Sequence, residues 1–190
     1  KEKEAKVVST NADIDLALIK ADIYPPRVAA LRDYGGPIKS GDRAMVIGYP
    51  LDSGITGEYK VAKTQVTGVR GPTGEPKWLQ FEDAAQKGNS GGPLLDMSGN
   101  VIGVIVGKST LMRYNPLSAR NEVVSNADLA VSLPYLRKFL QKNRIYYRKM
   151  TSQVHLSPRY IERHAAEYTV NIHCIQPSRN AQFKGLSTGQ

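Results

Sequence analysis

The first two thirds of the chain alternate between short apolar or β-branched runs and turn residues. The runs are IDLALI (14–19), RAMVIGY (43–49), EYKVAKTQVTGV (58–69), KWLQFED (77–83), GGPLLD (91–96), NVIGVIVG (100–107) and DLAVSL (128–133). Between them lie Gly, Pro, Asn and Asp, as in GPIKSGD, GPTGEP and MSGN, which is the punctuation expected between antiparallel strands. This spacing predicts an all-β barrel or sandwich.

The pattern changes from a strand period to a helix period at Pro134. In SLPYLRKFLQKNRIYYRK, the apolar residues Leu136, Phe139, Leu140 and Tyr147 recur at helical spacing, which predicts an amphipathic helix over about 134–147. Further on, LSPRYIERHAAEY (156–168) suggests a second short helix and TVNIHCI (169–175) a strand, followed by a polar tail. We treat 150–190 as an appendage of unassigned role.

Length and composition indicate a globular protein of about one domain. Of 190 residues, 41% are hydrophobic, and the longest apolar runs, such as VIGVIV at 101–106, are far shorter than the roughly 20 residues needed to cross a bilayer. We therefore expect no membrane span. Cys174 is the single cysteine, which excludes an intrachain disulfide. Because the chain starts inside the charged segment KEKEAK, we expect it to be part of a longer precursor.

Positive charge is concentrated in one segment. The formal net charge is +9, and between Arg137 and Arg163 eight Lys or Arg face one acid, Glu162. Two interpretations are open: a solvated helix face, or a surface for an anionic partner such as nucleic acid or an envelope polymer.

The stretch QKGNSGGPLLD (86–96) surrounds Ser90 with small, flexible residues. A serine hydroxyl attacks a carbonyl usefully only when a neighbouring base takes its proton. GNSGG fits the G-x-S-x-G elbow of α/β-hydrolases, but that elbow needs a helix directly after the serine, and Gly91, Gly92 and Pro93 disfavour one. An α/β-hydrolase-type esterase is kept as an alternative because its chain order, serine then acid then histidine, can be filled here. The residues in that order are Ser90, then Asp96 or Asp128, then His155, His164 or His173.

Four segments in order resemble the chymotrypsin-like (trypsin-fold) serine proteases, most closely the disulfide-free bacterial HtrA-like branch. They are NADIDLALIK (11–20), GDRAMVIGYP (41–50), GNSGGPLLDMSGNVIGV (88–104) and SNADLAVSLPYLRKFLQ (125–141). The resemblance covers roughly residues 10–145. It implies an all-β double barrel, with the rest of the first barrel and a linker in 1–34, and the second barrel with its C-terminal helix in 35–149.

The resemblance also implies the site residues. Ser90 matches the nucleophile and Asp15 the aspartate that orients a catalytic histidine, with Asp13 as a nearby competitor. The backbone N–H groups of Gly88 and Ser90 match the oxyanion hole, where a glycine-rich turn presents both donors to one point. The function that the resemblance implies is endopeptidase hydrolysis of peptide bonds through an acyl-enzyme on Ser90.

The resemblance also implies which residues contact the substrate. Val106, Gly107 and Lys108 match the strand that pairs with an extended peptide or protein substrate. Ala84 matches the base of the specificity pocket, which predicts cleavage after small or medium aliphatic residues. If Asp83 occupies that place instead, basic residues become acceptable.

The catalytic base is missing from its expected place. In the family the histidine precedes the aspartate by several tens of residues, whereas fourteen residues precede Asp15 and none is His. Three hypotheses compete: the base lies on an N-terminal part outside this chain, the protein is an inactive peptide-binding or scaffold relative, or His155 or His164 reaches back to Ser90. Under the first hypothesis these residues alone are inactive.

The sequence also bears on metal ions, cofactors and cellular location. The spacing of His164, His173 and Cys174 fits no usual zinc pattern, so we expect no metal and no cofactor. Like its exported relatives, the protein is expected in the periplasm or outside the cell.

Overall fold

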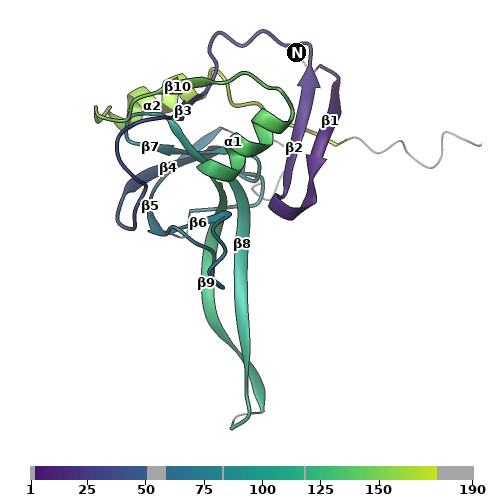
Figure 1. The fold of residues 1–190 in the computed structure, drawn as a ribbon, viewed down its shortest axis with the longest axis vertical. Coiled ribbons are helices and arrows are strands. Elements are labelled where there is room, and N and C mark those ends of the chain that lie inside the picture. The colour runs from purple at the N-terminus through teal and green to yellow at the C-terminus, as the bar shows by residue number, and fades with distance from the viewer. Residues whose placement is uncertain (1–2, 51–58, 83, 118, 175–190) are drawn as a thin grey trace, which may run out of the picture.

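The computed structural model describes residues 3–50, 59–82, 84–117 and 119–174, and most of its regular structure is β (Figure 1). The strands are β1 (Ala5–Asn11), β2 (Leu16–Ala21), β3 (Ala30–Arg32), β4 (Arg43–Gly48), β5 (Lys60–Gly68), β6 (Trp78–Phe81), β7 (Pro93–Asp96), β8 (Val101–Asn115), β9 (Arg120–Ser132) and β10 (Arg148–Met150). The helices are the 3₁₀ turn η1 (Ala12–Ile14), α1 (Leu133–Lys142) and α2 (Pro158–Ala165). No helix in these ranges combines the length and the apolar character needed to span a bilayer.

Six strands form a closed antiparallel barrel. They follow the order β8-β7-β4-β5-β6-β9, and the pairing of β8 with β9 closes the ring. This confirms the predicted all-β barrel. The residues after Ser90 enter strand β7 and not a helix, so the α/β-hydrolase alternative is wrong.

Strands β4 and β7 are buried on both faces, which explains their unbroken apolar runs. On β4, Ala44 and Val46 belong to the cluster inside the barrel, whereas Met45 and Ile47 belong to the cluster outside it. The inner cluster comprises Ala44, Val46, Val66, Leu79, Phe81, Ala85, Leu94, Ile102, Ile105 and Ala130. The outer cluster comprises Leu31, Met45, Ile47, Leu95, Val101, Leu133, Leu136, Ile161 and Ala165, so both helices contribute to it.

The hairpin β1–β2 forms a separate two-stranded sheet beside the barrel. Ile14, at its turn, is buried in a third cluster with Val131 of β9 and Phe139 of α1. The side chains of Val7 and Val8 on β1 are 64% and 58% exposed. The hairpin is therefore anchored at its turn, while part of its length carries uncovered apolar side chains.

Helix α1 is shorter than its apolar pattern predicts. It ends at Lys142, where the Asn143 side chain donates to the carbonyl of Phe139 at 2.8 Å. Arg144 then adopts a left-handed backbone (φ 55°), and the Ile145 N–H returns to the Leu140 carbonyl. This closing turn ends the helix five residues before 147, although Tyr147 still packs on the outer cluster.

The segment after 150, whose role the sequence leaves open, packs on the barrel. Strand β10, just before this segment, runs parallel to β3, and within the segment α2 buries Ile161 and Ala165 (2% and 0% exposed) in the outer cluster. The second helix is thus confirmed. The strand predicted over 169–175 is wrong for 169–174, which form no strand, and the polar tail from 175 lies outside the described residues.

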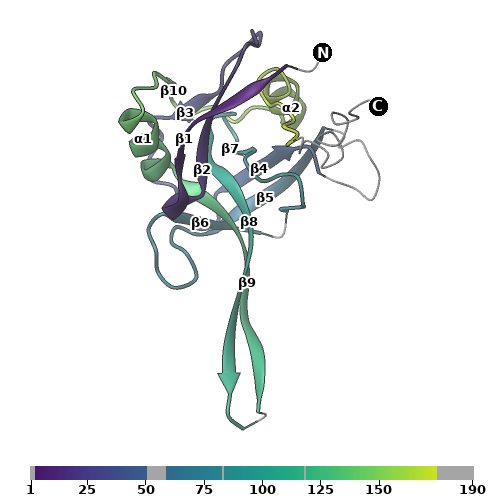
Figure 2. The same ribbon diagram turned by 90° about the vertical axis from the view of Figure 1, so that its right-hand side faces the viewer.

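Strands β8 and β9 extend as a two-stranded ribbon well beyond the barrel (Figures 1 and 2). Their pairing continues to Asn115 opposite Arg120, whereas the apolar pattern predicts strands ending at Gly107 and starting again at Asp128. The barrel parts of both strands lie at the candidate site.

Candidate functional site

Ser90 lies in a tight turn that leads into β7. Gly88 and Gly91 on either side have positive φ (98° and 83°), a conformation that favours glycine. The Asn89 N–H donates to the carbonyl of Gln86 at 3.0 Å. Asn89 is buried while Ser90 is exposed, so the turn presents the serine outward.

Two further glycines let this turn sit directly on strand β4. A Cβ at Gly92 would lie 2.3 Å from the carbonyl oxygen of Ile47, and a Cβ at Gly48 would lie 2.8 Å from Asn89 Oδ1. Side chains at these positions would collide with backbone or with a buried side chain. The Gly-rich composition of the stretch therefore serves close packing as well as turn geometry.

The serine turn is fastened to β8 by three hydrogen bonds. The N–H of Gly91 donates to the Ile105 carbonyl at 2.8 Å, and the Ile105 N–H donates to the Gly92 carbonyl at 2.9 Å. The Ser90 hydroxyl itself donates to the carbonyl oxygen of Val106 at 2.8 Å. A Cβ at Gly107 (φ 145°) would lie 3.8 Å from Ser90 Oγ. The predicted nucleophile and the predicted peptide-binding strand are thus adjacent.

A buried aspartate on β9 positions the loop before the serine. Asp128, 3% exposed, accepts hydrogen bonds from the N–H groups of Ala84 (2.7 Å) and Ala85 (2.6 Å) through Oδ2. Ala84 packs against the inner cluster, and Lys108 pairs with Asp128 in the β8–β9 register. Asp83, the alternative residue for the pocket base, lies outside the described residues.

The sequence did not predict the positioning role of Asp128. From the sequence, this residue was a candidate only for the acid in the serine, acid, histidine order of α/β-hydrolases. The other such acid, Asp96, accepts from the N–H groups of Ser98 and Asn100 and from the Ser152 hydroxyl. Both aspartates hold backbone turns. The only sequence signal for Asp128 is an acid immediately before the apolar run LAVS.

Asp15 lies at the turn of the β1–β2 hairpin, directly after η1. It has a left-handed backbone (φ 52°) and an exposed side chain. Its neighbours Ile14, Leu16 and Leu18 belong to the third cluster, and Val106 of β8 packs on the same cluster. The competitor Asp13 accepts from Lys77 Nζ through its backbone carbonyl at 2.6 Å. The hairpin that carries Asp15 and the strand beside Ser90 therefore pack on the same apolar cluster.

None of the described histidines contacts Ser90. His155 Nδ1 lies 3.3 Å from Arg43 Nη2, and His164 Nδ1 lies 2.7 Å from the carbonyl of Tyr160, with its ring over the tyrosine ring. His173 is exposed. In the described ranges, no three His, Cys, Asp or Glu side chains gather in a way that would hold a metal ion.

The basic segment 137–163 is partly neutralised. Asp33 forms ion pairs with Arg137 (3.3 Å) and Lys149 (3.6 Å). Arg137 also donates to the Arg32 carbonyl. Among the described residues, two of the eight basic residues thus have an acidic partner, and an anionic partner for this segment stays a prediction.

Comparison with known proteins identifies relatives of this arrangement. A family model described as a trypsin-like peptidase domain matches residues 1–104. The uncharacterized protein y4bJ of Sinorhizobium fredii is 30% identical over 136 residues, which are 72% of this chain and 21% of that protein. A probable periplasmic serine endoprotease, DegP-like, of Brucella suis is 33% identical over 107 residues (54% and 20%). Mouse serine protease HTRA4 is 23% identical over 189 residues (98% and 36%).

Solved structures share the fold. The HtrA-type protease AlgW with a decapeptide superposes with a TM-score of 0.55 at 24% identity, covering 75% of this chain and 41% of that one. The active form of the Rv3671c protease of M. tuberculosis gives 0.55 at 24% identity, covering 80% and 63%. The fold is therefore that of the chymotrypsin-like proteases. The chain spans about a fifth to a third of the length of the curated relatives described above.

Proposed function

This chain belongs to the family of trypsin-like peptidase domains, and we propose that it carries the nucleophile, the oxyanion donors and the peptide-binding strand of an HtrA-type serine endopeptidase. One observation carries the proposal: the exposed Ser90 hydroxyl is held at the edge of β8, 2.8 Å from the Val106 carbonyl. A substrate strand added at that edge would place its scissile carbonyl over the serine.

The reaction is acyl transfer to water. Ser90 Oγ attacks the scissile carbonyl carbon while an imidazole takes its proton, and the N–H groups of Gly88 and Ser90 stabilise the oxyanion. The imidazolium then protonates the leaving amine as the C–N bond breaks. A water molecule hydrolyses the resulting ester by the same steps in reverse order, which restores the serine.

Asp15 is the residue that would orient this imidazole. The support is its position on a hairpin whose apolar residues pack in the same cluster as Val106. We propose that the imidazole comes from outside the described residues, since His155 and His164 have partners elsewhere. The exposed Val7 and Val8 of β1 offer apolar surface on which further strands of a first barrel would pack.

Substrate binding uses two elements. Val106, Gly107 and Lys108 would pair with the peptide backbone, and Ala84 would line the pocket for the residue before the scissile bond. A half-buried alanine leaves room there for small or medium aliphatic side chains. The likeness to a probable periplasmic endoprotease supports an exported location for this protein as well.

A peptide-binding or scaffold role is the second candidate. It is favoured by the described histidines, because His155 and His164 have partners away from Ser90, whose hydroxyl donates to a backbone carbonyl that cannot activate it. The two functions share the peptide site and differ only in whether a base is present.

Cleavage of unfolded casein by the full-length protein separates them. We expect activity that is abolished by Ser90→Ala and reduced about 10⁴-fold by Asp15→Asn, since the imidazole loses its orienting partner. Asp13→Asn is the matched control and should retain activity. Binding of casein without cleavage would favour the scaffold, and loss of activity in Asp13→Asn but not Asp15→Asn would reverse the assignment of the aspartate.

A further inference from the structure

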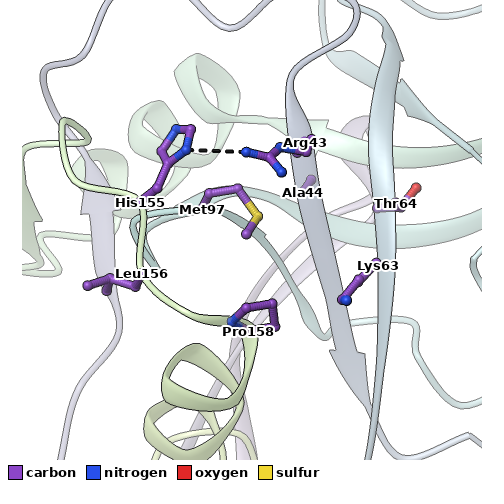
Figure 3. A pocket seen from close by; sticks show the side chains of 8 residues that line it. All are labelled: Arg43, Ala44, Lys63, Thr64, Met97, His155, Leu156 and Pro158. Atoms are coloured by element: carbon purple, nitrogen blue, oxygen red, sulfur yellow. Dashed lines mark hydrogen bonds between the residues drawn. The ribbon is translucent and has the colours of Figure 1, made fainter.

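A second pocket lies away from Ser90, between strands β4 and β5 and the segment that leads into α2 (Figure 3). Its volume is about 220 Å³. Arg43 of β4 and Lys63 of β5 line it on one side, and His155, Leu156 and Pro158 line it on the other. Two parts of the chain more than ninety positions apart therefore build it together.

Apart from Thr64, whose hydroxyl donates to the Glu82 carbonyl at 3.0 Å, the polar side chains that line this pocket are basic. Arg43 and Lys63 are exposed, and among the described residues no acidic side chain forms an ion pair with either. Arg43 Nη2 lies 3.3 Å from His155 Nδ1, and because a guanidinium only donates, Nδ1 accepts this hydrogen bond and the Nε2–H of the ring is left to donate. Three side chains therefore offer hydrogen-bond donors, and two of them carry full positive charge.

Helix α2 adds to the positive potential. It begins at Pro158 in the pocket wall, with Ser157 as its N-cap. Pro158 has no N–H and the Ser157 side chain accepts from the Tyr160 N–H, so this helix end contributes its partial positive charge and not a set of open donors. The basic side chains and the helix end come from separate elements and point to the same kind of ligand.

The walls restrict that ligand further. Met97, Leu156 and Pro158 give the pocket an apolar lining beside the cations. An inorganic anion would pair with the basic groups but leave this lining uncovered. A carboxylate that carries a short apolar group would satisfy both, and a volume below the roughly 300–1,000 Å³ of drug-sized sites limits that group to about one side chain.

We propose that this pocket binds a small aliphatic carboxylate, either a free acid or the C-terminal residue of a peptide, with its carboxylate at Arg43 and Lys63 and its apolar group against Met97, Leu156 and Pro158. The site is independent of Ser90 and of the proposed peptidase activity. Binding stabilises the fold, because the pocket exists only when the segment 155–158 is packed against β4 and β5.

Calorimetric titration of the full chain with N-acetyl-leucine tests the proposal. We expect saturable binding, with N-acetyl-leucinamide, which lacks the negative charge, binding at least about tenfold more weakly. Inorganic phosphate should also bind more weakly than the acid. Equal affinity for acid and amide, or phosphate binding as tightly as the acid, would overturn the proposal.

Variants assign the binding to this pocket. Arg43→Gln and Lys63→Gln should each weaken binding about threefold, whereas Lys20→Gln, an exposed lysine on β2, should not change it. All three side chains are exposed, so their thermal midpoints without ligand should match that of the parent. Unchanged affinity in both pocket variants would place the ligand elsewhere and contradict the proposal.

A last titration identifies the source of the carboxylate. The tripeptide Ala-Ala-Leu and N-acetyl-leucine carry the same terminal group. Tighter binding of the tripeptide supports recognition of a polypeptide C-terminus, and equal binding supports a free acid. Binding of neither would overturn the site.

Discussion

The carboxylate of Asp128 and the backbone N–H of Ala85 are joined by a 2.6 Å hydrogen bond that ties β9 to the loop before Ser90. The same oxygen accepts from Ala84 at 2.7 Å, so one buried carboxylate fixes two consecutive amides. This contact connects the barrel wall to the candidate specificity pocket.

Replacing Asp128 tests this connection. Asp128→Ala leaves two amides without their acceptor and should lower the free energy of unfolding by about 1–3 kcal/mol, measured by urea denaturation. Asp128→Asn retains an acceptor oxygen and should lose less. Asp22→Ala, at an exposed aspartate, is the control. Equal unfolding curves for Asp128→Ala and the control would show that the contact contributes nothing.

Gly92→Ala tests the close seating of the serine turn on β4. The added Cβ meets the Ile47 carbonyl oxygen at 2.3 Å, so the turn must shift, at a cost of about 1–3 kcal/mol. The Gly91 N–H donates to the Ile105 carbonyl, and the Ile105 N–H donates to the Gly92 carbonyl. Hydrogen exchange of both amides should become faster in this variant. Gly74→Ala, at a turn glycine with open space around it, should leave both amides protected.

Ile161→Ala tests whether the segment after 150 belongs to the folded unit. Ile161 is 2% exposed in the outer cluster, and truncating it should cost about 2–4 kcal/mol. Ile172 is 59% exposed, and Ile172→Ala should change stability by less than about 0.5 kcal/mol. If the two variants unfold alike, α2 packs on the barrel without stabilising it.

Alkaline stability depends on a half-buried tyrosine, Tyr168. Burial raises the pKa of Tyr168 from 10.0 to about 12, so above pH 10 the unfolded chain loses this proton first and stability falls as the pH rises toward 12. Tyr168→Phe should therefore remove about 1 kcal/mol of the loss seen at pH 11 relative to pH 9. Tyr24→Phe, at a 90% exposed ring, should leave that loss unchanged. A Tyr168→Phe profile as steep as the parent's would contradict this cause.

The barrel was predictable from sequence because two of its strands, β4 and β7, are apolar on both faces. RAMVIG and PLLD become β4 and β7 with nearly every residue buried. The ribbon beyond Gly107 was not predictable, because KST (108–110) and SNA (125–127) carry no alternating apolar pattern. The pairing of each ribbon strand is set by its partner strand. The three-residue strands β3 and β10 depend on each other, a contact between positions more than a hundred apart.

The candidate site also has features that the sequence predicted and features that it did not. The glycines around Ser90 are visible as a motif, and the adjacency of Val106 and Gly107 follows from family resemblance. The support from Asp128 was not predicted, because a lone acid before an apolar run does not indicate which loop it will hold. The basic pocket was missed for a related reason: Arg43, Lys63 and His155 meet only when the chain after 150 folds back.

Reaction of the full-length protein with a fluorophosphonate tests the central claim most directly, because the serine oxygen displaces fluoride from phosphorus only when a base takes the serine proton. The account predicts a single adduct that peptide mapping places on Ser90 and that Ser90→Ala abolishes. A folded full-length protein that stays unlabelled, or a label on another residue, would contradict it.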